Sequence, residues 1–377
     1  MESSGEKNES EEAAVVHGTG GSCDAGGLNR WWRAGRKTEE PLIGNGSNRK
    51  EAYDFFRANE MRERNLPEAW LPRVSGALKS LSISDFWVQS CCRQSEVLSM
   101  VSACCHKLLE LEVKNAWLSL ENLNPMPMLT SLTLERIRLD DNDISQVNKC
   151  LPNLQVLNLI DIEGLEVPII RLLNLKTCHW TVDHWSSMTL ITPNLITLRL
   201  ECIRLATLYV QAPMLSHFHL ALDYAGVFFV KEFENLKTLL LESSYMYSLI
   251  IKFPRIETIE NLTLNSRDSH IRSSKFTLKN LLAGFRTVTS LCLNSRVWTE
   301  FETCYDPFNR VVWEGRNGLK TFCGYLLLVD PSLTFTIVAW LLDQCFNLVD
   351  VSDSSTVMLL LMYPEVSLLG VWLGGLM

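Results

Sequence analysis

Cysteine pairs are the first residues of this chain whose spacing suggests chemistry. Cys91 and Cys92 are adjacent, and so are Cys104 and Cys105. Structural zinc needs four converging Cys or His ligands, usually spaced as C-x2–4-C pairs. Adjacent side chains instead point to opposite faces of a strand, or about 100° apart around a helix. We therefore expect small apolar residues on a helix here, with no metal site, and no cofactor elsewhere.

Four histidines, His179, His184, His217 and His219, lie close together in the sequence. No cysteine or carboxylate stands beside them at ligand spacing, so we do not expect a metal site. His179 and His219 take outward positions on predicted strands. They could contact a partner there, or they could simply be solvated, and the sequence leaves both readings open.

The chain lacks the common motifs of catalysis and phosphate binding. It contains no G-x-S-x-G turn. It also contains no G-x-x-x-x-G-K-[ST] loop and no G-x-G-x-x-G loop. We therefore expect a protein that is not an enzyme; a converging acid–base group in the folded chain would revive that alternative.

The composition is typical of a folded protein with no preference for nucleic acid or membranes. Of 377 residues, 47% are apolar and 21% are charged, and the net charge is -8. A negative chain is not drawn to phosphate backbones or anionic lipids. Residues 1–10 are polar and acidic, unlike a secretory signal. We expect the 12 cysteines to be reduced thiols in the cytoplasm, the nucleus or both.

A repeated leucine phrase predicts the elements that position these side chains. The phrase [LV]-x-x-L-x-L occurs at residues 129–134, 154–159, 195–200, 236–241 and 288–293. Looser copies extend it from residue 78 to residue 351, at intervals of about 20–31 residues. Each unit of such a repeat closes its apolar face against its neighbours. The predicted fold class is α/β: a leucine-rich-repeat solenoid, or horseshoe, with irregular repeats.

Side-chain alternation assigns the two faces of each strand. Leu132 and Leu134 point inward and Thr133 points outward. Where the common phrase continues to an Asn, this chain has Ile137, Ile162 and Ile203, which we expect to extend the core. The predicted strand centres are Leu81, Leu111, Leu132, Leu157, Cys178, Leu198, Phe218, Leu239, Leu262, Leu291, Phe322 and Val351.

Repeat length predicts the return path between strands. Repeats of about 30 residues have room for a helix, and residues 144–151 and 334–345 fit one. Repeats of about 20 residues have room only for an extended or single-turn segment. The short repeats occupy the middle of the array.

The chain divides into four predicted segments. Residues 1–50, rich in Gly, Ser, Glu and Asn, are expected to be disordered. Residues 51–72 could form a short helix and linker. Residues 73–352 are the leucine-rich-repeat domain. Residues 353–377 are an apolar tail, in which Pro364 and Glu365 interrupt the run that a membrane helix would need.

The repeats resemble those of the plant F-box/leucine-rich-repeat proteins. The resemblance rests on the Pro-Asn-Leu openings in residues 151–162 and 192–203, and on the irregular repeat lengths. It implies a substrate receptor of a cullin–RING ubiquitin ligase, whose F-box docks on the ligase adaptor while the solenoid captures the target. No F-box is recognisable here, and residues 51–72 are at most a remnant of one.

The outward strand positions are the candidate partner-binding surface, because their mixed polar character suits a protein more than a phosphate backbone. Tryptophans in the predicted loop at 296–318 are further candidates, since aromatic residues are favoured binding anchors; packing into the end of the solenoid is the alternative that the sequence leaves open for them. The candidate residues are Thr133, Glu135, Asn158, His179, Arg199, Glu201, His217, His219, Glu242, Asn265, Trp298 and Trp313.

The predicted function is a protein–protein interaction module of the ubiquitin-ligase type. Its partners would be a target protein, held on the concave face or by the end loops, and the cullin adaptor if a docking segment exists. The alternative is a free-standing leucine-rich-repeat scaffold with no link to ubiquitin. Neither reading involves nucleic acid or a membrane.

Overall fold

The computed structural model describes residues 13–17, 71, 75–84, 94–231, 233–267, 281, 284–303, 318–324, 336, 339, 345 and 347–353. The chain divides into two units. The first consists of residues 1–154 and 162–164, and the second of residues 155–161 and 165–377. Each unit is built from parallel strands.

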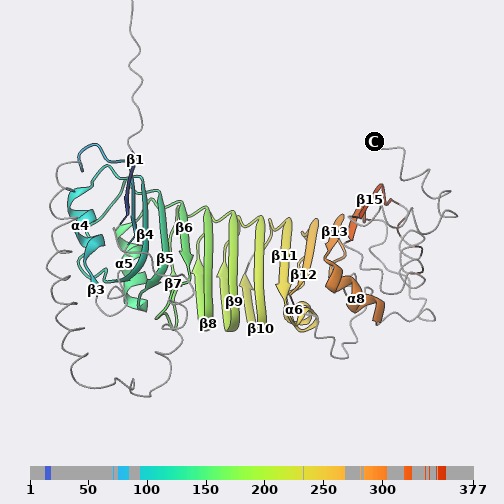
Figure 1. Cartoon of the computed structure of the whole chain (residues 1–377). Helices are drawn as coiled ribbons and strands as arrows, with labels where there is room; N and C mark the ends of the chain where they lie inside the picture. The colour runs from blue at the N-terminus through green and yellow to red at the C-terminus, as the bar shows by residue number, and fades with distance from the viewer. Residues whose placement is uncertain are drawn as a thin grey trace, which may run out of the picture. The chain divides into compact units, whose positions relative to one another are not determined.

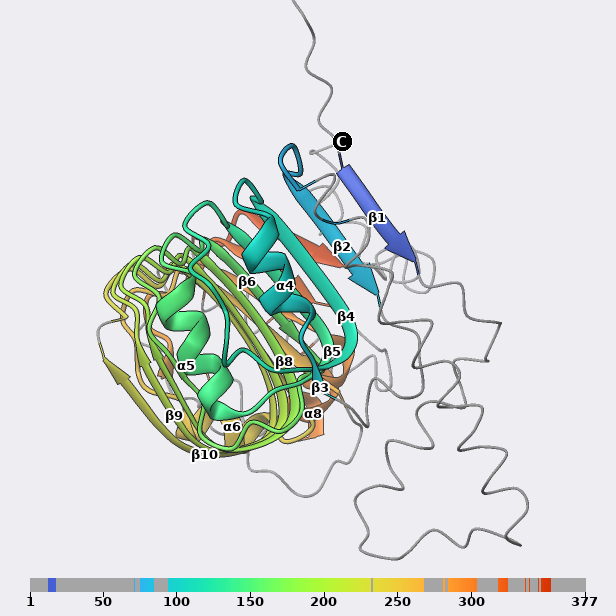
Figure 2. The ribbon, with the colours of Figure 1, turned by 90° about the vertical axis from the view of Figure 1, so that its left-hand side faces the viewer.

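In its described residues, the first unit combines a parallel sheet with the helices α4 and α5 (Figure 1). Its strands pair in the order β1–β2–β4–β5, and the short β3 pairs with the end of β4. Seen end-on, its two helices face the viewer (Figure 2). Its elements are β1 (Ala13–His17), β2 (Ser80–Ser84), β3 (Gln94–Ser95), α4 (Val97–Cys104), β4 (Glu110–Leu118), β5 (Ser131–Arg138) and α5 (Asp141–Cys150).

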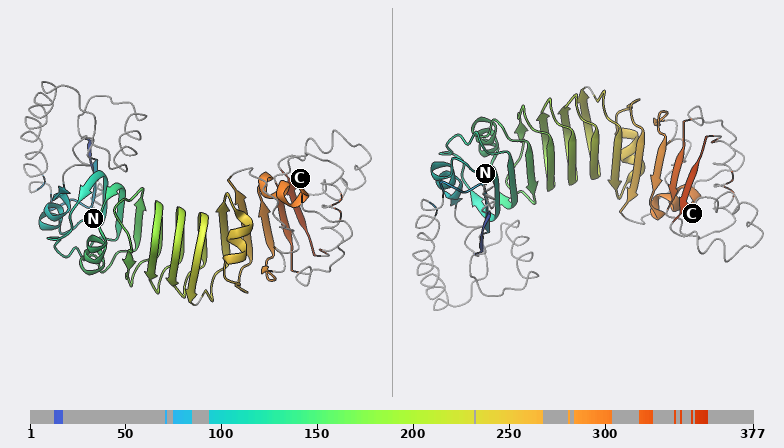
Figure 3. Two further views of the ribbon diagram at one scale, coloured as in Figure 1. Left: turned by 90° about the horizontal axis from the view of Figure 1, so that it is seen from below. Right: turned by 90° about the horizontal axis from the view of Figure 1, so that it is seen from above.

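The second unit stacks nine strands in chain order, side by side and parallel (Figure 3). The short β7 pairs with the later part of β8. The elements are β6 (Val156–Ile160), β7 (Ile169–Ile170), β8 (Thr177–Ile191), β9 (Thr197–Gln211), β10 (His217–Lys231), β11 (Thr238–Ser243), α6 (Met246–Lys252), β12 (Asn261–Ser266), β13 (Ser290–Leu293), α8 (Ser295–Thr303), β14 (Thr321–Gly324) and β15 (Asp350–Asp353).

The predicted strand centres are confirmed as partners in the ladder. In the first unit, Leu81 pairs with Leu111 and Leu111 with Leu132. In the second unit, one unbroken row of partners runs from Leu157 to Val351. Every inter-strand step joins the centre that the sequence assigns to one repeat with the centre of the next.

Burial follows the alternation that the leucine phrase predicts. In β11 and β12 the inward residues are buried, whereas most of the intervening residues are partly exposed. Leu198, Leu239 and Leu291 are each 0% exposed. A fully buried leucine contributes roughly 1.5–3 kcal/mol of transfer free energy, so this row stabilises the stack without metals or disulfides among the described cysteines.

The short middle repeats return by an extended path, as predicted. β8, β9 and β10 are each 15 residues long. Their ladder continues past the leucine phrase into a second run, where residues 204–211 pair with both 184–191 and 224–231. Gly226 lies at a break in this second run, and a Cβ atom there would lie 1.9 Å from the Ala206 carbonyl oxygen. These repeats therefore present a second strand face on their return side.

Asparagines one residue before the first leucine of the phrase hold successive repeats together, in the Pro-Asn-Leu opening at Asn194 and in the Glu-Asn-Leu opening at Asn235. The Nδ2 atoms of Asn194 and Asn235 donate to backbone carbonyl oxygens of the preceding repeat, at Leu173 (2.8 Å) and Pro213 (2.8 Å). Thr287 takes the same place in its repeat, and its hydroxyl donates to the Ile259 carbonyl oxygen of the preceding repeat at 2.9 Å. These side chains satisfy carbonyl oxygens in the turns that lead into the strands.

The helix predicted at 144–151 is confirmed as α5, which begins earlier than expected. Asp140 caps it by accepting a hydrogen bond from the Asp143 N–H at 2.9 Å, and Asp143 Oδ2 accepts one from the Asp140 N–H at 3.0 Å. This reciprocal pair is a capping box. Asp143 Oδ1 also accepts a bond from the Leu120 N–H at 2.8 Å, which ties the helix to the segment after β4.

Three expectations are corrected by the structure. Ala13–His17 form β1, so the disorder expected for residues 1–50 does not hold for these five. Ile203 is 39% exposed, because Cys202 takes the inward position and the burial alternation of β9 breaks at residues 203–204, where the ladder skips Ile203. The loop expected at 296–318 begins as helix α8, which Asn294 caps by accepting from the Val297 N–H at 3.0 Å. The remainder of the segments 1–50, 51–72 and 353–377 lies outside the described residues, as does most of the helix expected at 334–345.

Replacing Leu198 with aspartate should unfold the repeat stack, because it buries a charge without a partner. The control is Ile196→Asp, at a side chain that is 42% exposed two residues earlier. Thermal melting followed by circular dichroism should show a lost or strongly lowered transition for the first variant and a near-native one for the second. Equal melting of the two variants would show that the inward phase of β9 is wrong.

Replacing Asn235 with alanine should lower the free energy of unfolding by about 1 kcal/mol, because the bond to the Pro213 carbonyl is lost. Met214 is the matched control: it takes the same place one repeat earlier and is 52% exposed. Met214→Ala should change the stability by less than about 0.5 kcal/mol. Urea unfolding measures both, and equal losses would contradict a role for the asparagine bond.

Candidate functional site

The outward strand residues of the second unit form continuous rows across the sheet. The residues that pair with one another from Asn158 of β6 to Ser352 of β15 are called the middle row. The residues two positions later in β8 to β12 are called the last row. The last row comprises Thr181, Glu201, Ala221, Glu242 and Asn265. The middle row comprises Asn158, His179, Arg199, His219, Leu240, Thr263, Cys292, Cys323 and Ser352.

Basic residues of the middle row pair with acids of the last row. His179 Nε2 lies 3.4 Å from Glu201 Oε1, and the same oxygen accepts a hydrogen bond from Arg199 Nε. The pairing is therefore between strands as well as along them. Seven predicted site residues of the second unit lie in these two rows: Asn158, His179, Arg199, Glu201, His219, Glu242 and Asn265.

A second group forms around Glu242. Its Oε1 atom lies 3.3 Å from His219 Nε2 and accepts a 3.3 Å hydrogen bond from Asn265 Nδ2. Arg267 approaches its Oε2 atom at 3.5 Å. The His219 contact is close but poorly aligned for a hydrogen bond, so this ring nitrogen has no hydrogen-bond partner among the described residues. Predicted residues His219, Glu242 and Asn265 are thus brought together, and Arg267 joins them.

Burial and charge set the protonation of these groups. Burial lowers the pKa of His219 below its ordinary value, although the Glu242 carboxylate opposes the shift. Burial alone would raise the pKa of Glu201. The hydrogen bond and charge of Arg199, with the nearby His219 and His179, outweigh it and hold that pKa below its usual range. At neutral pH the patch therefore presents carboxylates, guanidinium groups and a neutral His219.

The first unit carries its own charged cluster on outward positions. Lys114 Nζ lies 2.9 Å from Glu112 Oε1 and 3.0 Å from Glu135 Oε2. Ser82 donates to Glu112 at 2.5 Å, and this bond and Lys114 lower the pKa of that carboxyl. The predicted residue Glu135 belongs to this cluster, and its neighbour Thr133 pairs with Glu112 in the ladder.

Two predicted residues, His217 and Trp298, lie outside the two rows. His217 is exposed at the start of β10 and lies 2.7 Å from the Ser216 hydroxyl through its Nδ1. Trp298 is corrected: it is 0% exposed in α8 and packs against Phe322, with ring centroids 5.9 Å apart. The helical turn of α8 points it into the core, so it cannot anchor a partner. Trp313 lies outside the described residues.

An exposed aromatic surface on the return side was not predicted from the sequence. Val227 and Phe229 of β10 are each 55% exposed, and Tyr224 is 50% exposed. Tyr224 stacks on Tyr245 with ring centroids 4.9 Å apart, and its hydroxyl donates to that of Tyr245 at 3.1 Å. Alternation continued beyond the leucine phrase would have placed Val227 and Phe229 on one face.

No metal centre is visible in the part of the chain that the structure describes: no three His, Cys, Asp or Glu side chains converge there. Burial raises the pKa of Cys105 to about 11, with a further contribution from Cys104, so this thiol is a poor metal ligand. Cys91 and Cys92 lie outside the described residues. None of the described helices is long and apolar enough to cross a membrane.

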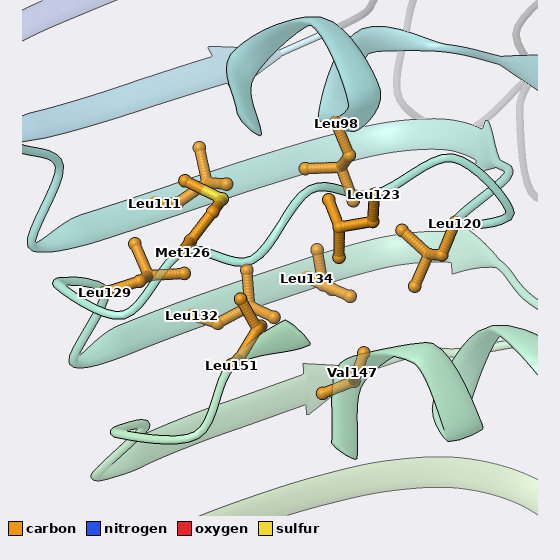
Figure 4. A pocket seen from close by; sticks show the side chains of 10 residues that line it. All are labelled: Leu98, Leu111, Leu120, Leu123, Met126, Leu129, Leu132, Leu134, Val147 and Leu151. Atoms are coloured by element: carbon orange, nitrogen blue, oxygen red, sulfur yellow. The ribbon is translucent and has the colours of Figure 1, made fainter. Parts of the chain in front are cut away.

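The described core of the first unit contains a small apolar space (Figure 4). Its volume is about 10 Å³, roughly what one water molecule needs, and no polar atom lines it. It is therefore a packing gap in the core and not a ligand site. Its lining residues are Leu98, Leu111, Leu120, Leu123, Met126, Leu129, Leu132, Leu134, Val147 and Leu151.

Comparisons with known proteins add one relative. No protein-family model matches the chain. Over 260 residues it is 43% identical to an F-box/LRR-repeat protein of Arabidopsis thaliana. The match covers 67% of this chain and 58% of the relative, so the chain spans a little over half of that protein's length. The similarity applies to the shared stretch of the two chains.

Replacing His219 with glutamine should remove a pH dependence of stability. The folded pKa lies below the ordinary value of 6.5, so the unfolded chain binds a proton first. The stability is therefore fully present above pH 6.5 and is lost as the pH falls toward the folded pKa. Urea unfolding between pH 7.5 and 5 should show a shallower loss in the variant.

The control for this measurement is Thr263→Val, a non-titrating exchange in the same row. It should keep the pH dependence of the parent. A His219→Gln variant whose free energy of unfolding followed the parent at every pH would contradict the buried, neutral state of His219.

Proposed function

Because the chain belongs to the plant F-box/leucine-rich-repeat family, we propose that it is a protein-interaction subunit that holds a target protein on the outward faces of its strands. It would act as the substrate-recognition part of an F-box-type cullin–RING ubiquitin ligase, in the cytoplasm or nucleus. In such a complex other subunits transfer ubiquitin, so this chain would bind and position the target without chemistry of its own.

The observation that carries the proposal is the pair of charged rows on β8 to β12. Glu201 is contacted by Arg199 of its own strand and by His179 of β8, and Glu242 by Asn265 and Arg267, so both carboxylates are held in place before a partner arrives. A preorganised surface loses less entropy on binding than a mobile one. The alternation of acid, guanidinium and imidazole along the rows supports a partner with a matching pattern of charges.

The character of these rows supports a protein partner. Arginine is enriched in protein interfaces, and mixed charges give specificity more than raw affinity. A phosphate backbone would instead favour a surface of one positive sign. We propose further that the stack curves as a horseshoe with the charged rows on its concave side, which would let a target contact several repeats at once.

The ligase role needs a docking segment for the adaptor. In the family this segment is the F-box, and the sequence contains no recognisable one. Residues 51–72 are the remaining candidate. The alternative function is a free-standing scaffold that uses the same surface and needs no adaptor.

Binding to a purified cullin adaptor separates the two functions. The full chain should bind the adaptor saturably in isothermal titration, and a chain without residues 1–72 should not, because any docking segment precedes the first repeat. If neither protein binds, the ligase role is removed and the scaffold function remains. If both bind equally, the docking segment lies within the repeats.

Arg199→Ala should lower target binding at least tenfold, since a buried interface arginine is often worth more than about 1.4 kcal/mol. The matched control is Arg204→Ala, an exposed arginine on the return half of the same strand. Quantitative affinity purification from plant extract should recover the same proteins with the control as with the parent. Loss of those proteins with Arg204→Ala alone would place the binding surface on the return side.

A further inference from the structure

Two cysteines stand next to each other in the middle row. Cys292 of β13 and Cys323 of β14 are direct ladder partners. In both strands the residues on either side of the cysteine are buried and the cysteine is partly exposed. Both thiols therefore leave the same face of the sheet at the same height.

This pair differs from most other described cysteines. Cys105, Cys150, Cys178, Cys202 and Cys345 are all buried, and only Cys104 shares the partial exposure of the pair. Burial raises the pKa of Cys178 and of Cys202 to about 12, which makes these core thiols unreactive at neutral pH. Among these residues, accessibility and a facing thiol coincide at Cys292 and Cys323.

We propose that Cys292 and Cys323 form a redox dithiol that a small disulfide, such as glutathione disulfide, closes into a reversible cross-strand bond. Direct partners in a parallel ladder have Cα atoms about 4.8 Å apart, which lies within the roughly 4.4–6.8 Å that disulfides span. Their Cβ atoms start about as far apart as the strands and must approach by about 1 Å, because the preferred Cβ separation in a disulfide is about 3.8 Å. The bond is therefore somewhat strained and readily reduced, which makes it reversible.

The reaction balances with one molecule of oxidant. One cysteine thiolate attacks a sulfur of the small disulfide, forms a mixed disulfide and expels one small thiolate. The second cysteine thiolate then attacks the protein sulfur of that mixed disulfide and expels the other. Two cysteine thiols are oxidised to one disulfide, and the small disulfide is reduced to two thiols that take up the two protons.

The reaction should accelerate with pH. Burial, together with the hydrogen bond and charge of Cys323, raises the pKa of Cys292 to about 11. Whichever cysteine attacks the small disulfide first, Cys292 must lose its proton once, either as the first or as the second attacking thiolate. The thiolate fraction rises about tenfold per pH unit below the pKa. Closure should therefore be slow at pH 7 and markedly faster at pH 9.

The position of the pair gives the bond a consequence for binding. Thr263 and Ser352 flank the two cysteines in the middle row, so the bond would link two repeats within the surface proposed to hold the target. The effect on target binding rests on the proposed function. Formation of the disulfide is independent of that function, and the experiment below measures only whether the disulfide forms.

The test is incubation of the reduced full chain with glutathione disulfide at pH 7, 8 and 9, followed by alkylation and peptide mass spectrometry. The expected product has lost two hydrogens, has two fewer alkylated thiols, and carries a peptide that joins Cys292 to Cys323. Dithiothreitol should restore both thiols. The rate should rise by at least tenfold between pH 7 and 9.

Two single variants, Cys292→Ser and Cys178→Ser, test whether the disulfide needs the facing pair. Cys292→Ser should leave a stable glutathione adduct on Cys323, because no second thiol resolves it. Cys178→Ser, which removes a core thiol, should close as the parent does. A background in which Cys23, Cys91, Cys92 and Cys304 are serine should give the same product. A parent that accumulates adducts without ring closure, or that pairs either cysteine elsewhere, would overturn the proposal.

Discussion

The structure depends on one row of side chains that bury one another from repeat to repeat. Each inward leucine of β9 closes against its ladder partners in β8 and β10, and the same step recurs up to β14. A repeat alone cannot bury this face. Because the strand period is two, fixing the inward row also fixes the outward rows, so the core decides which side chains reach solvent.

The buried inward row fixes the positions of the residues in the outward rows. Parallel pairing at a spacing of about 4.8 Å brings His179 beside Glu201, and Arg267 near Glu242. These contacts come from residues 20 to 30 positions apart in the sequence. The same spacing places Cys292 beside Cys323. One ladder thus supplies the proposed target surface and the proposed dithiol.

The sequence was sufficient to predict the structure wherever the two-residue alternation of side chains along a strand, or a local helix cap, determines it. It placed the strand centres, the inward face and the helix α5, because the leucine phrase and Asp140 act locally. It was not sufficient where the path of the chain decided the structure. The sequence left open whether Trp298 anchors a partner or packs inward, and helix α8 buries it. Ile203 is exposed because the burial alternation of β9 breaks at residues 203–204. The ion pairs and the exposed Val227 and Phe229 required the ladder register, which single phrases do not contain.

The most direct test of the central claim is a cysteine-accessibility scan along β9. Single cysteines at Thr197, Leu198, Arg199 and Leu200 would be labelled with a maleimide under native conditions and followed by peptide mass spectrometry. The expected result is alternation, with labelling at 197 and 199 at least tenfold faster than at 198 and 200. Equal rates at all four positions, or the opposite alternation, would show that these leucines do not form the shared inward row.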